Sequence, residues 1–221
     1  MKKTALITGA SRGIGLAISE RFRRAGVKVL APTRKEMDLL LNESIDEYLL
    51  TLKAPVDILI NNAGINILAG IAELSDGVMQ DTMQTNLLAP LRIVRGIAKG
   101  MIKRKYGRII NISSIWGEIT KPKRVTYSMS KAALNAMTRT LAVELAPYNI
   151  LINSVAPGYV NTELTRKNNS VKEISAIKSG IPLKRLAEPE EIAEFVEFLA
   201  SNRNTYITGQ VIIIDGGFIC L

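Results

Sequence analysis

The glycine-rich segment near the N-terminus constrains the fold of this chain more than any other stretch. The apolar run TALIT over 4–8 predicts a short buried strand, and the amphipathic pattern over 16–25 predicts a helix soon after it. Between them stand Gly9, Gly13 and Gly15, in the spacing G-x-x-x-G-x-G. A strand, a glycine-rich turn and a helix in this order favour a parallel α/β sheet.

Each glycine of this turn has a physical task if the turn binds a phosphate. Gly9 permits the tight turn, Gly13 lets the backbone approach a pyrophosphate, and Gly15 lets the helix pack against the strand. The free N–H groups and the positive dipole end of the helix would then face the anion. The spacing differs from the general G-x-G-x-x-G fingerprint, and a purely structural turn is the alternative. The residues expected to form the cradle are Gly9, Ser11, Arg12, Gly13, Ile14 and Gly15.

The end of the second predicted strand, 27–31, bears on the type of nucleotide. NAD-preferring proteins place an acidic residue there for the ribose 2′-hydroxyl, whereas this chain has Thr33 followed by Arg34 and no carboxylate to repel a 2′-phosphate. Arg12 and Arg34 can hold such a phosphate from two sides by charge-assisted hydrogen bonds. NADP(H) is therefore favoured over NAD(H), with two solvated arginines as the alternative.

Strands and helices alternate along most of the remaining chain. The run 37–40 is interpreted as a strand, which leaves no room for a helix after Arg34, so the second crossover helix is apparently missing. The next helix, 44–52, would be capped by Asn42 or Ser44. Further elements are expected at 56–60 (strand), from Ser75 or Asp76 to 104 (helix with a joint at Pro90), 108–112 (strand), 132–145 (helix extending back to Tyr127), 149–155 (strand), 190–200 (helix after Pro189) and 209–214 (strand).

This alternation predicts one α/β domain with a three-layer, doubly wound parallel sheet, a Rossmann fold, whose ligand lies at the carboxyl ends of the strands. We expect a cofactor half over about 1–110 and a catalytic and substrate half over about 111–221. The polar, weakly periodic segment 162–188 is interpreted as a mobile lid over the site.

Candidate catalytic groups follow the strand at 108–112. Ser114 precedes Tyr127 by thirteen residues, and Lys131 lies four residues beyond Tyr127, so the phenol and the ammonium share one helix face. A tyrosine four residues before a lysine is common by chance. The chain has no histidine, however, which excludes Ser-His-Asp, Cys-His and histidine-ligated zinc sites. Proton chemistry must therefore use other side chains.

If the nucleotide is one that reduces a carbonyl, the reaction needs a hydride on carbon and a proton on oxygen, and Tyr127 is then the natural acid. A free phenol titrates near 10, and the nearby Lys131 charge is expected to lower that pKa toward working pH. Ser114 would donate a hydrogen bond to the carbonyl oxygen and fix its orientation. The segment 115–126 is expected to form one wall of the substrate pocket.

Taken together, these residues resemble the short-chain dehydrogenase/reductase family, of the kind that includes 3-oxoacyl-[acyl-carrier-protein] reductases. The matching motifs appear in the family's order and span nearly the whole chain: TGASRGIG at 8–15, NNAG at 61–64, Asn86, Ser114, Tyr127, Lys131 and Pro157-Gly158. The resemblance implies a Rossmann-type subunit, a nicotinamide cofactor and a homotetramer or homodimer built partly on the helices that carry Asn86 and Tyr127.

The resemblance also implies roles for individual residues. Lys131 would hold the nicotinamide ribose, and Asn86 would order a water that replenishes the proton. Asp38 and Leu39 would border the adenine. Those expected to line the cofactor or hold its carboxamide are Asn62, Ala63, Gly64, Pro157, Gly158, Val160 and Thr162. The missing crossover helix and the short lid depart from most relatives, so neither the adenine side nor the substrate mouth can be inferred by analogy.

The leading hypothesis is thus an NADPH-dependent carbonyl reductase acting on a 3-oxoacyl thioester. An NAD(P)-dependent dehydrogenase of a sugar, polyol or other secondary alcohol is the alternative within enzymes. A nucleotide-sensing or nucleic-acid-binding subunit is a remote one, suggested by the net charge of +9. The basic residues stand in small groups that suit solvated surfaces better than a nucleic-acid site, although those near Arg104 and Arg124 would welcome an acidic carrier protein.

Cellular location is inferred from cysteine usage and hydropathy. The single cysteine, Cys220, cannot form an internal disulfide, which favours a reducing compartment. No apolar run reaches the ~18 residues of a membrane span. We expect a soluble cytoplasmic protein with no metal, no nucleic-acid partner and no membrane association.

Overall fold

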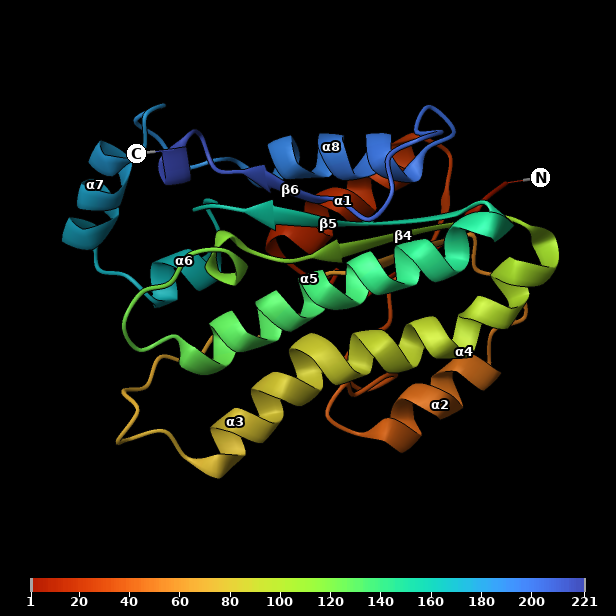
Figure 1. The fold of residues 1–221 in the computed structure, drawn as a ribbon, viewed down its shortest axis with the longest axis horizontal. Helices are drawn as coiled ribbons and strands as arrows, with labels where there is room; N and C mark the ends of the chain where they lie inside the picture. Colours follow the sequence, from red (N-terminus) through yellow and green to blue (C-terminus); the bar gives the residue numbers. More distant parts are fainter. Residues whose placement is uncertain (1, 221) are drawn as a thin grey trace.

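Six parallel strands form the centre of the molecule, in the order β2-β1-β3-β4-β5-β6. Figure 1 shows β4, β5 and β6 of this sheet. The six strands appear in a computed structural model that describes residues 2–220. The register places Ala5 of β1 between Val29 of β2 and Ile58 of β3. The strands are β1 (Thr4–Ile7), β2 (Lys28–Leu30), β3 (Ile58–Asn61), β4 (Gly107–Ile112), β5 (Ile150–Pro157) and β6 (Val211–Ile214). The predicted doubly wound α/β sheet is confirmed.

Helices cover both faces of this sheet (Figure 1). On one face α1 (Gly13–Arg24) packs against α8 (Pro189–Ala200), and Phe22 and Val196 lie in their shared core. On the other face α2 (Asn42–Leu50), α4 (Ala89–Arg104) and α5 (Val125–Leu145) bury a second core. The strands between the two cores are apolar on both sides, as expected for a parallel sheet covered twice.

The long helical region before β4 is interrupted, but the interruption precedes Pro90, where the joint was predicted. It consists of α3 (Asp76–Met83), a π-helical turn (Gln84–Leu88) and α4. Ser75 caps α3, since its Oγ accepts the N–H of Val78 at 3.3 Å. The π turn ends at Leu88, shortly before Pro90. It contains Asn86, one of the predicted site residues.

The strand predicted over 37–40 is wrong. As expected, no helix lies between Arg34 and Met37, but the described chain turns there instead of extending. Met37 is buried in the core around α2, and Leu39 packs against the same core without pairing to β2. Relative to the doubly wound order 3-2-1-4-5-6, the sheet formed by the described residues has no strand outside β2 and has one additional strand, β6, at the opposite edge. β2 is therefore an edge, and α2 alone makes the crossover from β2 to β3.

The predicted cap of α2 is also wrong. Leu41 occupies the N-cap position and makes no side-chain cap. The hydroxyl of Ser44 accepts the backbone N–H of Asp38 at 3.0 Å instead, which fastens the turn before the helix.

The segment 162–188 contains two helices, α6 (Glu163–Lys167) and α7 (Val171–Gly180). Ser170 and Glu173 form a reciprocal capping box at the start of α7. An isolated parallel bridge between Val160 and Ala187 ties the two ends of the segment together. Its mobility stays a prediction. Across residues 2–220, no helix has the length and apolar character needed to cross a membrane.

Candidate active site

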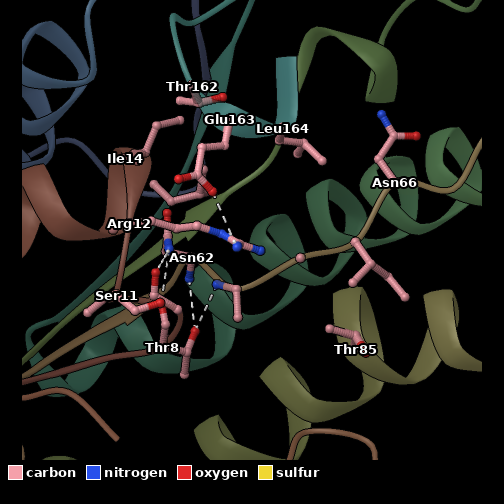
Figure 2. A pocket seen from close by; sticks show the side chains of 18 of the residues that line it. Thr8, Ser11, Arg12, Ile14, Asn62, Asn66, Thr85, Thr162, Glu163 and Leu164 are labelled. Atoms are coloured by element: carbon pink, nitrogen blue, oxygen red, sulfur yellow. Dashed lines mark hydrogen bonds and ion pairs between the residues drawn. The ribbon is translucent and has the colours of Figure 1, made fainter. Parts of the chain in front are cut away.

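The candidate site opens where the direction of strand connection reverses, between β1 and β3. Here Thr8 Oγ1 accepts the backbone N–H groups of Asn62 at 3.0 Å and Ala63 at 3.1 Å. The side-chain amide of Asn62 returns two hydrogen bonds, to the carbonyl oxygens of Thr8 and Gly9, each 3.0 Å long (Figure 2). These bonds hold the glycine-rich loop and the segment 61–64 against each other.

The glycine spacing matches this close approach. Gly9 and Gly13 have φ angles of +67° and +54°, which favour glycine. A Cβ on Gly15 would lie 2.2 Å from the carbonyl oxygen of Gly9 and 2.3 Å from the Asn62 amide nitrogen. The third glycine is thus required by the Asn62 bridge, which the sequence motif alone does not reveal.

A cavity of about 860 Å³ runs from this loop to the start of α5. Its size lies within the range of ligand pockets. The predicted residues that line it are Gly9, Ser11, Arg12, Gly13, Ile14, Gly15, Thr33, Arg34, Asp38, Leu39, Asn62, Ala63, Gly64, Ser114, Tyr127, Lys131, Pro157, Gly158, Val160 and Thr162. Of the predicted set, Asn86 alone stands behind the wall.

Ser114, Tyr127 and Lys131 meet at the buried end of the cavity. Ser114 directly follows β4, while the phenol and the amine project from the first turns of α5. Lys131 Nζ donates to the carbonyl oxygen of Ile112 at 2.7 Å and lies 5.6 Å from the Tyr127 ring centroid. All three side chains are buried. The strand end and the helix thus bring together the three groups expected to handle the carbonyl oxygen.

Burial dominates the titration of these groups, contrary to the expectation that Lys131 would lower the pKa of Tyr127. Burial raises the pKa of the Tyr127 phenol above its usual 10, opposed by Ser114 and by the charge of Arg124. Burial also lowers the pKa of Lys131 to about 8. The phenol is therefore held protonated at neutral pH, as a proton donor requires.

Asn86 is fixed by its neighbours. Its Oδ1 accepts the N–H of Ile65 at 2.9 Å, and its Nδ2 donates to Ile65 O and to Ser130 Oγ. A Cβ on Gly64 would lie 3.3 Å from Asn86 Oδ1 and 3.6 Å from Lys131 Nζ, so the amide stands next to the lysine. Its ordering of a water stays a prediction. The hydrogen bonds show that it braces the wall on which Lys131 lies.

The opposite end of the cavity carries mixed charges on the surface. Arg12 pairs with Glu163 at 3.4 Å (Figure 2), and Arg34 pairs with Asp38 at 3.1 Å. The expectation that no carboxylate lies at the end of β2 is wrong. Glu36 folds back in a turn and accepts both the N–H (2.7 Å) and the hydroxyl of Thr33, and these hydrogen bonds lower its pKa.

Sequence reasoning placed the segment 115–126 in a pocket wall but did not single out its residues. Trp116 and Arg124 line the cavity, together with Tyr159 from beyond β5. Trp116 and Tyr159 meet edge to face at 5.9 Å between ring centroids. Arg124 stands three residues before Tyr127, but it follows the exposed Lys121 and Lys123, and nothing in the sequence separates it from them.

The residues fit a nicotinamide dinucleotide. Helix α1 begins with no side-chain cap and no acidic residue in its first turn, so its N–H groups remain available to a pyrophosphate. A Cβ at Gly9 would lie 2.8 Å from Ala63 Cα, so the backbones of the glycine-rich loop and of segment 61–64 pass too close to each other for a side chain at Gly9. The cavity then leads on to the buried phenol.

Comparison with known proteins agrees with this geometry. A family model described as short chain dehydrogenase matches residues 3–53, and one described as enoyl-(acyl carrier protein) reductase matches residues 42–219. The chain is 39% identical to the 3-oxoacyl-[acyl-carrier-protein] reductase of Rickettsia typhi, over 98% of this chain and 97% of that protein.

Solved structures show the same architecture. A gluconate 5-dehydrogenase from Burkholderia cenocepacia, in complex with NADP and tartrate, superposes with a TM-score of 0.95 at 27% identity and covers 100% of this chain and 97% of its own. A 4-hydroxyisoleucine dehydrogenase mutant, complexed with NADH and succinate, has a TM-score of 0.94 at 34% identity and covers 99% of both chains. The chain therefore belongs to the short-chain dehydrogenase/reductase family and is an oxidoreductase that acts on CH–OH and C=O groups.

Proposed function

We propose that this enzyme reduces a carbonyl to a secondary alcohol with NADPH and that its preferred substrate is a 3-oxoacyl thioester. The observation that carries the proposal is the buried group of Ser114, Tyr127 and Lys131 at the end of a cavity that begins in a glycine cradle. The full-length similarity to 3-oxoacyl-[acyl-carrier-protein] reductases supports the choice of substrate.

The chain's own residues supply the proton chemistry. The bound nicotinamide supplies the hydride to the carbonyl carbon. Ser114 donates a hydrogen bond to the carbonyl oxygen and aims it, and Tyr127 Oη transfers its proton to that oxygen as the alcohol forms. Lys131 stabilises the phenolate left behind. The predicted water, ordered by Asn86, then returns a proton to Tyr127.

The preference for NADPH rests on Arg12 and Arg34, whose guanidinium groups stand at the open end of the cavity. Glu36 opposes it, because its carboxylate lies on the turn that follows β2. We therefore propose a modest preference. Both arginines are already paired with carboxylates, so a 2′-phosphate must compete for them.

Oxidation of a small hydroxy acid or polyol is the second candidate. It is favoured by the close superposition on dehydrogenases named for gluconate and 4-hydroxyisoleucine. The lining adds polar groups, among them Asn66, Asn168 and Asn169, that suit a hydroxylated substrate.

We also propose a homo-oligomer, a dimer or tetramer, and delivery of the substrate on acyl carrier protein. Exposed apolar side chains on α4 and α5 support self-association, namely Leu91, Met129 and Val143. The basic residues near Arg104 and the loop before α5 would suit an acidic carrier. Sedimentation of the purified chain tests the first point, and an interaction that weakens with salt would support the second.

The test of function is NADPH oxidation with an acetoacetyl thioester and a panel of ketones and sugars, with NADH in parallel. Consumption that is fastest with the thioester and NADPH is expected. Turnover confined to polyols or hydroxy acids in the oxidative direction would select the second candidate. Silence with every carbonyl and alcohol, together with salt-sensitive DNA binding, would favour a nucleic-acid-binding subunit instead.

A further inference from the structure

Arg124 is a buried cation that has no acidic partner among residues 2–220. It is 4% exposed, whereas the lysines at 121 and 123 beside it are exposed. Its guanidinium lies 4.8 Å from the centre of the Trp116 ring and makes no hydrogen bond or ion pair to any described residue. Burying a charge is costly unless hydrogen bonds compensate for the lost water.

Other arginines of the chain are compensated. Arg108 is equally buried; its Nη1 and Nη2 groups donate to the carbonyl oxygens of Gly107, Asn149 and Asn204, and its Nε alone has no acceptor among the described residues. Arg185 forms a two-pronged pair with Glu191 at 2.6 and 2.8 Å. Arg124 lines the cavity, and its guanidinium donates to no residue in 2–220, so a molecule bound in the cavity can supply the acceptor.

The position of Arg124 relates it to the reacting centre. It is the residue before α5 and stands three residues ahead of Tyr127, so both side chains leave the same side of the helix start. Its charge opposes the rise in the pKa of Tyr127 and of Tyr159, so it lies within electrostatic range of both side chains. An acceptor bound there would belong to the molecule whose carbonyl meets Tyr127.

We propose that Arg124 binds the acyl oxygen of the substrate, the carboxylate of a 3-oxo acid or the carbonyl oxygen of a 3-oxoacyl thioester. This inference rests on the proposed carbonyl reduction at Tyr127. A guanidinium fork matches a carboxylate better than a single neutral oxygen, because two charge-assisted hydrogen bonds then form. Arg124 therefore contributes more to the free acid than to the thioester, and nothing to an isolated ketone.

Three substrates separate these cases: acetoacetate, an acetoacetyl thioester, and 2-pentanone, which has no acyl oxygen. Arg124→Met keeps an unbranched side chain over Trp116 but removes the charge. Its kcat/KM should fall about 100-fold with acetoacetate, about tenfold with the thioester and less than about threefold with 2-pentanone, as expected for loss of charge-assisted hydrogen bonds. Arg124→Lys should recover part of the activity with acetoacetate.

Lys53→Met is the matched control, since it removes an exposed positive charge outside the cavity lining. It should leave all three activities unchanged. An equal fall with all three substrates in Arg124→Met would overturn the proposal, because Arg124 would then be supporting the fold. An unchanged acetoacetate activity would overturn it as well.

A binding measurement separates this inference from the proposed function. Trp116 is the only tryptophan of the chain, so its fluorescence reports on the neighbourhood of Arg124. Butyrate, added to the enzyme with NADP⁺, should give a saturable change in emission that Lys53→Met retains and Arg124→Met loses. No saturable change in the natural chain would overturn the inference. A clear butyrate signal without turnover of any carbonyl would leave the anion site standing and refute the proposed function.

Discussion

Both ends of the cavity carry titratable side chains, but these are buried at one end and exposed to solvent at the other. At the catalytic end Tyr127 and Lys131 are 9% and 3% exposed, and burial shifts the pKa of both. At the open end the side chains of Arg12 and Arg34 are 76% and 74% exposed and pair with surface carboxylates. Water and salt weaken charges at the second end but not at the first. Substitutions should therefore change chemistry steeply at one end and cofactor choice gently at the other.

The largest effect is expected from Tyr127→Phe. Loss of the proton donor should lower kcat by about 10³-fold or more, within the usual range for general acid catalysis. NADPH binding, measured by fluorescence titration, should change by less than about threefold because the ring remains in place. Tyr206→Phe is the control, since Tyr206 is 95% exposed and far from the described cavity lining. Turnover near that of the natural chain would refute the role of Tyr127.

Lys131→Met should lower turnover by about 10²-fold, since a charge placed at the developing phenolate is lost. The same variant tests burial through stability. The pKa of Lys131 falls from 10.5 to about 8 on folding, so the unfolded chain binds more protons between those values and stability from this group rises with pH there. The full shift corresponds to about 3 kcal/mol.

Urea unfolding of the natural chain and of Lys131→Met, followed from about pH 8 to pH 10.5, measures this contribution. The free energy of unfolding of the natural chain should increase relative to that of Lys131→Met as the pH rises from about 8 to 10.5. Below pH 8 the difference between the two free energies should be constant. A difference that does not change with pH would show that the amine is not held in a low-dielectric site.

Between the two ends, substitutions in the glycine-rich loop should change the stability of the protein through added side-chain volume rather than through charge. Gly15→Ala forces a methyl group against Gly9 and Asn62 and should cost about 1–3 kcal/mol in unfolding free energy. Gly77→Ala, in α3, meets nothing within 4 Å and should stabilise the protein by about 0.5–1 kcal/mol. Thermal unfolding of the two variants measures both changes in stability. Equal effects of Gly15→Ala and Gly77→Ala would contradict the close approach of Gly15 to Gly9 and Asn62.

The smallest effects are expected at the open end of the cavity. Arg34→Gln should raise the KM for NADPH by up to about tenfold and leave kcat unchanged, since exposed pairs contribute little. Glu36→Gln should lower that KM by about twofold, with the KM for NADH unaffected. A large change in kcat in either variant would contradict the expectation that this end affects the choice of cofactor and not the chemistry.

Local patterns predicted the parts of the site that depend on neighbouring residues. A strand, a glycine turn and a helix are visible in sequence because each is a short-range preference, and Tyr127 and Lys131 share a face by helix geometry. The interpretation of 37–40 as a strand failed because a short apolar run does not distinguish a strand from a buried turn. Met37 and Leu39 reach the core by side-chain packing alone.

Other features depend on contacts that sequence spacing does not reveal. Glu36 returns to Thr33 only because the chain turns there. The pKa of Tyr127 rises because the core around it excludes water, an effect that a count of nearby charges misses. Arg124 resembled its exposed neighbours in sequence, and only burial against Trp116 distinguishes it. The capping box of Ser170 and Glu173 was readable as S-x-x-E and would have predicted α7.

A crystal structure of Tyr127→Phe with NADPH and acetoacetate tests the central claim most directly. We predict that the nicotinamide lies at the buried end of the cavity, with the ketone oxygen within hydrogen-bond distance of Ser114 Oγ and facing the position of the lost hydroxyl. The carboxylate should lie on Arg124. A substrate bound away from Ser114, or a nicotinamide outside the end formed by Tyr127 and Lys131, would contradict the account.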